Sequence, residues 1–147
     1  MSHVGGTVSH LWNTHIKPRA DARYVNESQV KTVRGAYFIE ATAAGANTIA
    51  TDSISFGFTM PTAPVAHFIN SGATPPAECP GTVQLPKALP GHLCVYEGIS
   101  QNTTNRATWN PTGGGGTTAT RMGVGLYAYS DAAGQFKSHG TWAVTTP

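Results

Sequence analysis

The chain has 147 residues, enough for one ordinary domain that buries about 70% of its unfolded surface without a metal. Its formal net charge is +2 and its basic residues form no stripe, which argues against a nucleic-acid partner. No stretch approaches the ~18 apolar residues that a membrane-spanning helix needs, and the first residues lack the pattern of a signal peptide.

Charged residues are concentrated near the N-terminus. Half of all Lys, Arg, Asp and Glu residues fall within residues 17–40, and the other half are spread over residues 41–147. The later region is rich in Thr, Ser, Asn, Gln and Gly, a composition common in extracellular and virion β-proteins. We therefore expect a connecting segment at residues 1–29 and a β-rich head domain at residues 30–147.

The connecting segment carries a short apolar stripe with spacings of four, three and four residues, as on one face of a helix. Thr7 is a candidate cap, and Pro18 ends the pattern, so a helix is predicted over residues 8–16. Such a short helix is marginal alone and needs a packing partner. The predicted contact residues of this neck are Val4, Val8, Leu11, His15 and Ile16.

From residue 30 onward the apolar residues recur with a period of two, the period of β-strands. In residues 52–60, for example, Ile54, Phe56 and Phe58 share one face. The strand candidates are residues 30–41, 52–60, 63–69, 82–85, 92–98, 106–111, 121–130 and 135–146. About eight short strands with turn signals between them predict an all-β fold, a β-sandwich or jelly roll.

The last two candidates have clear faces. In residues 121–130 the predicted inner face is Met122, Val124, Leu126 and Ala128, opposite Gly123, Gly125, Tyr127 and Tyr129. In residues 135–146 Phe136, Trp142 and Val144 lie opposite Lys137, His139 and Thr141. Residues 131–135 are predicted to form a hairpin loop between these strands. Residues 112–118 (TGGGGTT) are predicted to be a flexible loop, without the strand–helix context of a phosphate site.

Two cysteines, Cys79 and Cys94, frame a proline-rich loop. A disulfide between them would stabilise the fold by about 3 kcal/mol and imply an oxidising environment. Two buried free thiols are the alternative. A metal pair is disfavoured because few partner ligands accompany them.

Several segments resemble known fibre proteins. Residues 20–28 (ADARYVNES) resemble the joint between stem and head in phage tail fibres and surface fibres. Residues 11–30 resemble the segment before C-terminal heads of actinobacterial surface proteins, often downstream of collagen-like stalks. The head resembles those domains in ISFGF at residues 54–58, APVAHFI at 63–69, the cysteine block at 77–97 and GTWAV at 140–144.

This resemblance implies a homotrimeric head on a virion or a cell surface, with residues 8–16 meeting near a threefold axis. It implies a structural or attachment role and brings no catalytic residues or cofactor. The expected partners are other copies of the chain, other virion or surface-fibre proteins bound through the neck, and a host-surface glycan. Neither nucleic acid nor membrane is expected. This chain lacks the long stalk of the fibre proteins.

Titratable residues give little support for catalysis. The acidic residues form no close motif, and no nucleophile elbow occurs, although Asp52 and Glu97 could meet in space. Among the histidines, His67, His92 and His139 could converge, but scattered surface or core positions are the simpler interpretation. His15 is the one weak metal candidate, because three copies on a threefold axis could hold an ion or water.

Aromatic residues near loop edges are the best ligand-binding candidates. They are Trp109, beside Asn110 and Pro111, together with Tyr127 and Tyr129. The alternative is that Trp109 covers a core edge and the tyrosines fill a subunit interface. We therefore predict a non-catalytic attachment head. A lectin-like carbohydrate-binding module and a glycan-cleaving enzyme with a site between subunits are the alternatives.

Overall fold

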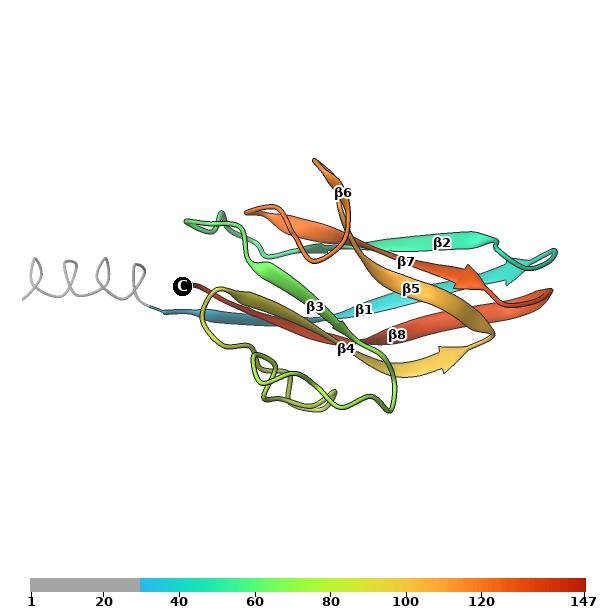
Figure 1. Cartoon of the computed structure of the whole chain (residues 1–147), viewed down its shortest axis with the longest axis horizontal. Coiled ribbons are helices and arrows are strands. Elements are labelled where there is room, and N and C mark those ends of the chain that lie inside the picture. The colour runs from blue at the N-terminus through green and yellow to red at the C-terminus, as the bar shows by residue number, and fades with distance from the viewer. Residues whose placement is uncertain (1–29) are drawn as a thin grey trace, which may run out of the picture. The chain divides into compact units, whose positions relative to one another are not determined.

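The computed structural model describes residues 30–147, of which Thr32–Pro147 form one compact unit (Figure 1). The predicted neck contacts Val4, Val8, Leu11, His15 and Ile16 lie outside the described residues. Within residues 30–147 there are strands, turns and loops but no helix, so none that could span a membrane.

Eight strands form two four-stranded sheets, which confirms the predicted all-β, two-sheet fold. The first sheet has the order β1-β8-β4-β3, and the second has the order β2-β7-β5-β6 (Figure 1). The strands are β1 (Thr32–Ala43), β2 (Ile49–Ser55), β3 (Val65–Ile69), β4 (His92–Gln101), β5 (Thr103–Asn110), β6 (Gly114–Gly115), β7 (Gly123–Ser130) and β8 (Gly134–Thr145).

The first sheet joins the start of the domain to its end. β1 is antiparallel to β8 along its whole length, with Thr32 opposite Thr145, so the entry of the chain lies beside its C-terminus. β4 is antiparallel to β8, whereas β3 is parallel to β4. A parallel pair needs a long crossover, and residues 70–91 supply it. We call this loop the covering loop.

The core lies between the sheets and consists of inward-facing apolar residues from both. The first sheet supplies Tyr37, Ile39, Leu93, Val95, Trp142 and Val144, and the second supplies Ile54, Val124, Leu126 and Ala128. Trp142 needs the glycine opposite it on β1, because a Cβ atom at Gly35 would lie 2.6 Å from the indole ring. The period of two seen in the sequence is therefore the alternation between core and surface.

The predicted hairpin at residues 131–135 is wrong. β7 and β8 belong to different sheets, because β8 pairs with β1 and β4. The segment between β7 and β8 crosses from one sheet to the other. It lies beside the turn between β4 and β5, where Asn102 has φ of 53°. The Asn102 side chain holds the two crossings together: its Oδ1 accepts the Ala132 N–H at 3.0 Å, and its Nδ2 donates to the Gln135 carbonyl at 3.3 Å.

Three local predictions also need correction. Residues 82–85 form a turn instead of a strand, with the Thr82 N–H donating to the Leu85 carbonyl at 3.0 Å. Prolines on both sides disfavour ladder pairing there. Met122 precedes β7 and is 59% exposed, so it is not on the inner face. In the predicted flexible loop, Gly114–Gly115 form the short strand β6, paired with the end of β5.

Candidate functional site

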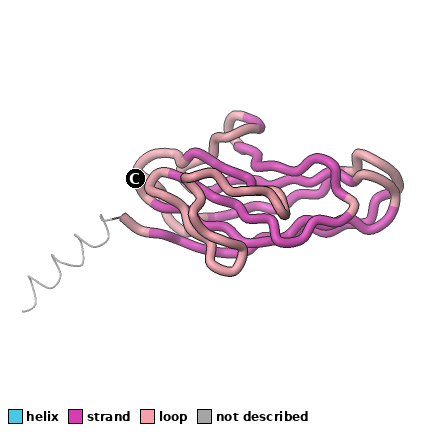
Figure 2. Tube along the Cα trace, turned by 60° about the horizontal axis from the view of Figure 1, so that its bottom comes forward, coloured by secondary structure: helices cyan, strands magenta, loops and turns pink. Residues whose placement is uncertain are grey.

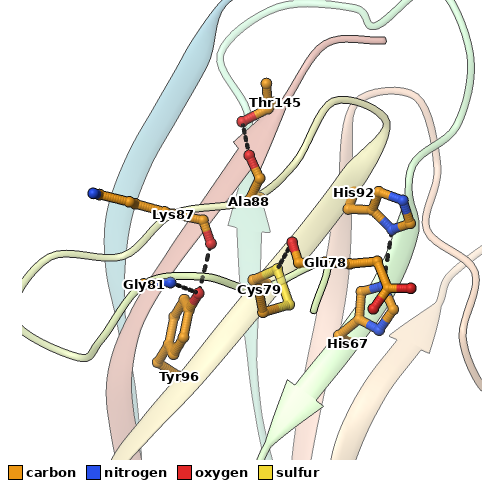
Figure 3. The surroundings of a disulfide bond; sticks show 10 residues. His67, Glu78, Cys79, Gly81, Lys87, Ala88, His92, Tyr96 and Thr145 are labelled. Atoms are coloured by element: carbon orange, nitrogen blue, oxygen red, sulfur yellow. Dashed lines mark hydrogen bonds between the residues drawn. A yellow bond between two sulfur atoms is a disulfide. The ribbon is translucent and has the colours of Figure 1, made fainter. Parts of the chain in front are cut away.

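The covering loop closes part of the outer face of the first sheet, while Phe38, at 56%, and Ile99, at 49%, remain exposed beyond it. In Figure 2, whose view brings the underside of Figure 1 forward, this loop lies in front of the strands. It packs Cys79, Val83 and Ala88 against the sheet residues Tyr96 and Ala143 in a small second core. The disulfide between Cys79 and Cys94 ties the loop to β4, which confirms the predicted bridge (Figure 3).

Hydrogen bonds fix the covering loop along most of its length. The Tyr96 hydroxyl accepts the Gly81 N–H at 2.9 Å and donates to the Lys87 carbonyl at 2.6 Å (Figure 3). Side chains of β1 and β8 donate to three further loop carbonyls: Arg34 to Pro86, Thr141 to Val83 and Thr145 to Ala88. The part of this face beneath the covering loop is therefore occupied by the chain's own residues.

Two histidines meet at the edge of the covered face. His67 Nε2 on β3 lies 2.9 Å from His92 Nδ1 on β4, with Glu78 of the loop nearby (Figure 3). Partial burial, and then the neighbouring His92, lower the pKa of His67, whereas the Glu78 carboxylate opposes this shift. Among the described residues, no group of three or more His, Cys, Asp or Glu is arranged to hold a metal ion.

His139 does not join this pair. It lies on the middle strand β8 and stacks on Phe38 of β1, with ring centroids 4.8 Å apart and an interplanar angle of 13°. Of the three histidines that the sequence analysis singled out, His67 and His92 come together and His139 does not.

The outer face of the second sheet has no comparable cover among the described residues. The pairing register places three outward-facing rows across β2, β7 and β5. The first row is Ile49, Tyr129 and Asn105; the second is Thr51, Tyr127 and Ala107; and the third is Ser53, Gly125 and Trp109. We call this surface the aromatic face.

The three predicted ligand-binding residues come together on the aromatic face. The Trp109 and Tyr127 ring centroids are 6.1 Å apart, and those of Tyr127 and Tyr129 are 5.7 Å apart. Both contacts are edge-to-face, with interplanar angles of 80° and 76°. Trp109 remains 50% exposed, so it is not the cover of a core edge. An aromatic cluster half open to solvent is typical of a binding surface.

These rings border a pocket of about 460 Å³. Its lining residues are Ile49, Thr51, Asp52, Asn105, Trp109, Gly125, Leu126, Tyr127 and Tyr129. Gly125 lies opposite Trp109, and a Cβ atom there would lie 3.3 Å from the Trp109 carbonyl oxygen and 3.6 Å from its Cβ. The missing side chain therefore lets the two strands approach closely at this pair. A mainly apolar pocket with a few polar groups is the usual form of a ligand site.

Local structure fixes the two ends of this pocket. Asn110, the buried neighbour of Trp109, accepts the Thr112 N–H at 2.8 Å through Oδ1 and donates to Thr118 Oγ1 at 3.1 Å. The loop after Trp109 is thereby anchored. On the edge strand β2, Asp52 accepts the Phe38 N–H at 2.9 Å and the Ser53 N–H at 2.7 Å. The sequence allowed Asp52 to meet Glu97, but its carboxylate instead ties β2 to β1 at the edge of the pocket.

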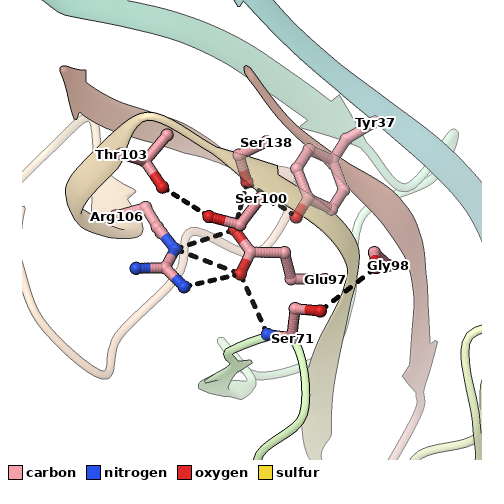
Figure 4. A network of polar contacts seen from close by, with 8 residues as sticks. All are labelled: Tyr37, Ser71, Glu97, Gly98, Ser100, Thr103, Arg106 and Ser138. Atoms are coloured by element: carbon pink, nitrogen blue, oxygen red, sulfur yellow. Dashed lines mark hydrogen bonds and ion pairs between the residues drawn. The ribbon is translucent and has the colours of Figure 1, made fainter. Parts of the chain in front are cut away.

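Glu97 instead lies in a buried polar network between the sheets (Figure 4). Its carboxylate accepts Arg106 Nε at 3.0 and 2.9 Å and Arg106 Nη2 at 2.9 Å, and also the Ser71 N–H at 2.9 Å. Ser138 donates to Glu97 at 2.5 Å, and Tyr37 in turn donates to Ser138 at 3.2 Å. Burial raises the pKa of Tyr37 above its ordinary value. The network satisfies a buried charge and joins the two sheets.

No family model, curated protein or solved structure matches this chain. The likeness to fibre heads therefore rests on the sequence segments quoted above. The functional argument rests on the geometry of the aromatic face.

Proposed function

We propose that this protein is a non-catalytic attachment head that binds a surface glycan through the aromatic face. The observation that carries the proposal is the cluster of Trp109, Tyr127 and Tyr129 around an open pocket. A pyranose ring has an apolar C–H face that packs on an aromatic ring, while its hydroxyls take hydrogen bonds from groups at the rim. Thr51 and Asn105 supply such polar groups here.

The contrast between the two outer faces supports the same proposal. The covering loop occupies the first sheet, with a disulfide and several hydrogen bonds holding it there. The second sheet keeps a half-exposed tryptophan and two tyrosines in the open. Large aromatic side chains left exposed in a cluster are costly unless they bind something.

The proposal also includes the assembly that the fibre-head resemblance implies. The head would be a homotrimer carried through residues 1–29 on other virion or surface-fibre proteins. First-with-last and second-with-seventh strand pairing supports a jelly-roll description of the sandwich. The described domain begins and ends at the same end of the sandwich, because Thr32 pairs with Thr145. The opposite end is formed by turns between strands.

A glycan array tests the binding function. The intact chain is compared with Trp109→Ala and Tyr127→Ala, and with Ile99→Ala as a control. Ile99 is 49% exposed on the first sheet, close to the exposure of Trp109, and lies outside the pocket lining. We expect the two aromatic variants to lose the glycans that the native protein and the control bind. Native signals that survive both substitutions would remove the proposal.

The assembly is tested separately by the native mass of the full chain at micromolar concentration. A trimer is expected. A stable monomer under these conditions contradicts the trimeric head but leaves glycan binding standing.

A further inference from the structure

We propose that the aromatic face selects an uncharged oligosaccharide that lies along β7, in preference to an acidic one. This inference rests on the proposed glycan-binding function and specifies the class of glycan. Three features of the site support this selectivity: the charges in the pocket, the hydrogen-bonding groups at its rim and the spacing of its rings.

The charge of the pocket disfavours an acidic ligand. The lining contains no Lys, Arg or His, and its one acidic residue, Asp52, directs its carboxylate to the backbone N–H groups of Phe38 and Ser53. The nearest basic residue along β5 is Arg106, but it faces inward and is held by Glu97. A uronic or sialic acid would therefore find no compensating cation in the pocket, and burying an unpaired charge is costly.

The rim instead offers groups suited to neutral hydroxyls. Thr51 and Asn105 are exposed on either side of the tyrosines, and their side chains make no hydrogen bond within the described part of the chain. An amide and a hydroxyl can each donate and accept, as sugar hydroxyls do. These groups therefore match an uncharged sugar without adding charge.

The rings are spaced for more than one sugar. Trp109 lies beside Gly125, and Tyr129 lies four residues further along β7. The ring centroids of Trp109 and Tyr127 are 6.1 Å apart and those of Tyr127 and Tyr129 are 5.7 Å apart, so the row of rings is longer than a single pyranose ring. The edge-to-face contacts do not stack the rings on one another, so more than one ring remains available for a sugar.

The experiment measures affinity for two matched series of probes. Oligogalacturonides of one to four units are compared with the same oligosaccharides after chemical reduction of their carboxyl groups, together with neutral gluco-, manno- and galacto-oligosaccharides. We expect a neutral series to bind, with affinity rising as units are added. Trp109→Ala is expected to weaken this binding by about tenfold or more.

Two further variants examine charge and space separately. Thr51→Lys, which adds a cation at the rim, is expected to improve the affinity for the acidic probes relative to their reduced counterparts. Gly125→Ala is expected to weaken neutral binding, because the added methyl group takes up space beside Trp109. Ile99→Ala is expected to bind as the native chain does.

The outcomes separate this inference from the proposed function. Stronger binding of acidic probes, lost in Trp109→Ala, overturns the selectivity for neutral sugars and keeps glycan binding. Binding of no glycan in these series or on the broad array overturns both. A smaller native mass for Trp109→Ala than for the native chain would identify the aromatic face as an interface between copies, and would also overturn both.

Discussion

The two sheets of this domain use the same alternation of residues, yet their outer faces differ. On the first sheet the covering loop buries Cys94, Tyr96 and Ala143 beneath a second small core. On the second sheet the corresponding outward positions hold Trp109, Tyr127 and Tyr129 around an open pocket. Part of one outward face is therefore built into a second core, with Phe38 and Ile99 exposed beyond it, whereas the other face carries an aromatic cluster around an open pocket.

This difference suggests that the covered face contributes to stability and the aromatic face to ligand binding, which substitutions can test separately. Changes on the covered face should alter the free energy of unfolding and spare ligand binding. Changes on the aromatic face should do the reverse. Changes in the polar network between the sheets should affect both, because Glu97 belongs to the first sheet and Arg106 to the second.

The largest effect is expected in that shared network. Arg106→Met leaves the fully buried Glu97 side chain without its charged partner, which should lower the free energy of unfolding by about 3–5 kcal/mol. Urea unfolding measures the loss. The double variant Glu97→Gln with Arg106→Met should recover part of it, because no unpaired charge remains. A single variant as stable as the native protein would contradict the role given to this pair.

A somewhat smaller effect is expected for the disulfide of the covered face. Replacing Cys79 and Cys94 by serine should lower the free energy of unfolding by about 3 kcal/mol, since the bond closes a loop with a sequence separation of 15. Reducing the native protein should lower its melting temperature in the same way. Glycan affinity should not change; its loss on reduction would show that the two faces are not independent.

Acidification should act on the covered face through His67. Because partial burial and His92 lower the pKa of His67 in the folded state, the unfolded state binds the proton more readily. The stabilising contribution is complete above the ordinary pKa of about 6.5 and is lost as the pH falls through the lower folded value. Melting temperatures between pH 8 and 4 measure this loss. His67→Gln should make the profile flatter, while His139→Gln should retain it; an identical slope in both would exclude His67 as the cause.

The smallest effect on stability is expected at the centre of the proposed site. Trp109 is 50% exposed, and Trp109→Ala removes one edge-to-face contact with Tyr127. Its cost should stay below about 1 kcal/mol in urea unfolding. The same variant should lose glycan binding. A much larger loss of stability would mean that Trp109 is a structural residue, and the contrast between the faces would fail.

The sequence was sufficient for features with a local signal. Alternation predicted the strands around Tyr37, Val124 and Trp142, because inward and outward positions repeat every two residues. The prolines between Cys79 and Cys94 indicated a tight loop, in agreement with the observed disulfide. The face opposite Leu126 correctly grouped Tyr127 with Tyr129, and the register then placed Trp109 beside them.

Features that depend on which strands pair could not be read in this way. Residues 131–135 have the composition of a hairpin, but their neighbours pair with distant strands in opposite sheets. The contact between Glu97 and Arg106 exists only because β4 and β5 lie in different sheets on either side of Asn102. Asp52 reaches β1 across the sheet edges, a contact that no local period indicates.

The antiparallel pairing of Thr32 with Thr145 also determines how this domain would respond to mechanical force. If Thr32 and Thr145 were pulled apart, the hydrogen bonds between β1 and β8 would break one residue pair at a time, starting from this end. Tension that enters through β1 and is resisted by a ligand on the second sheet acts along the strands. The hydrogen bonds between β1 and β8 are then loaded together in shear, since antiparallel bonds lie perpendicular to the strands. Loaded in this direction, the domain would resist force with all the hydrogen bonds between β1 and β8.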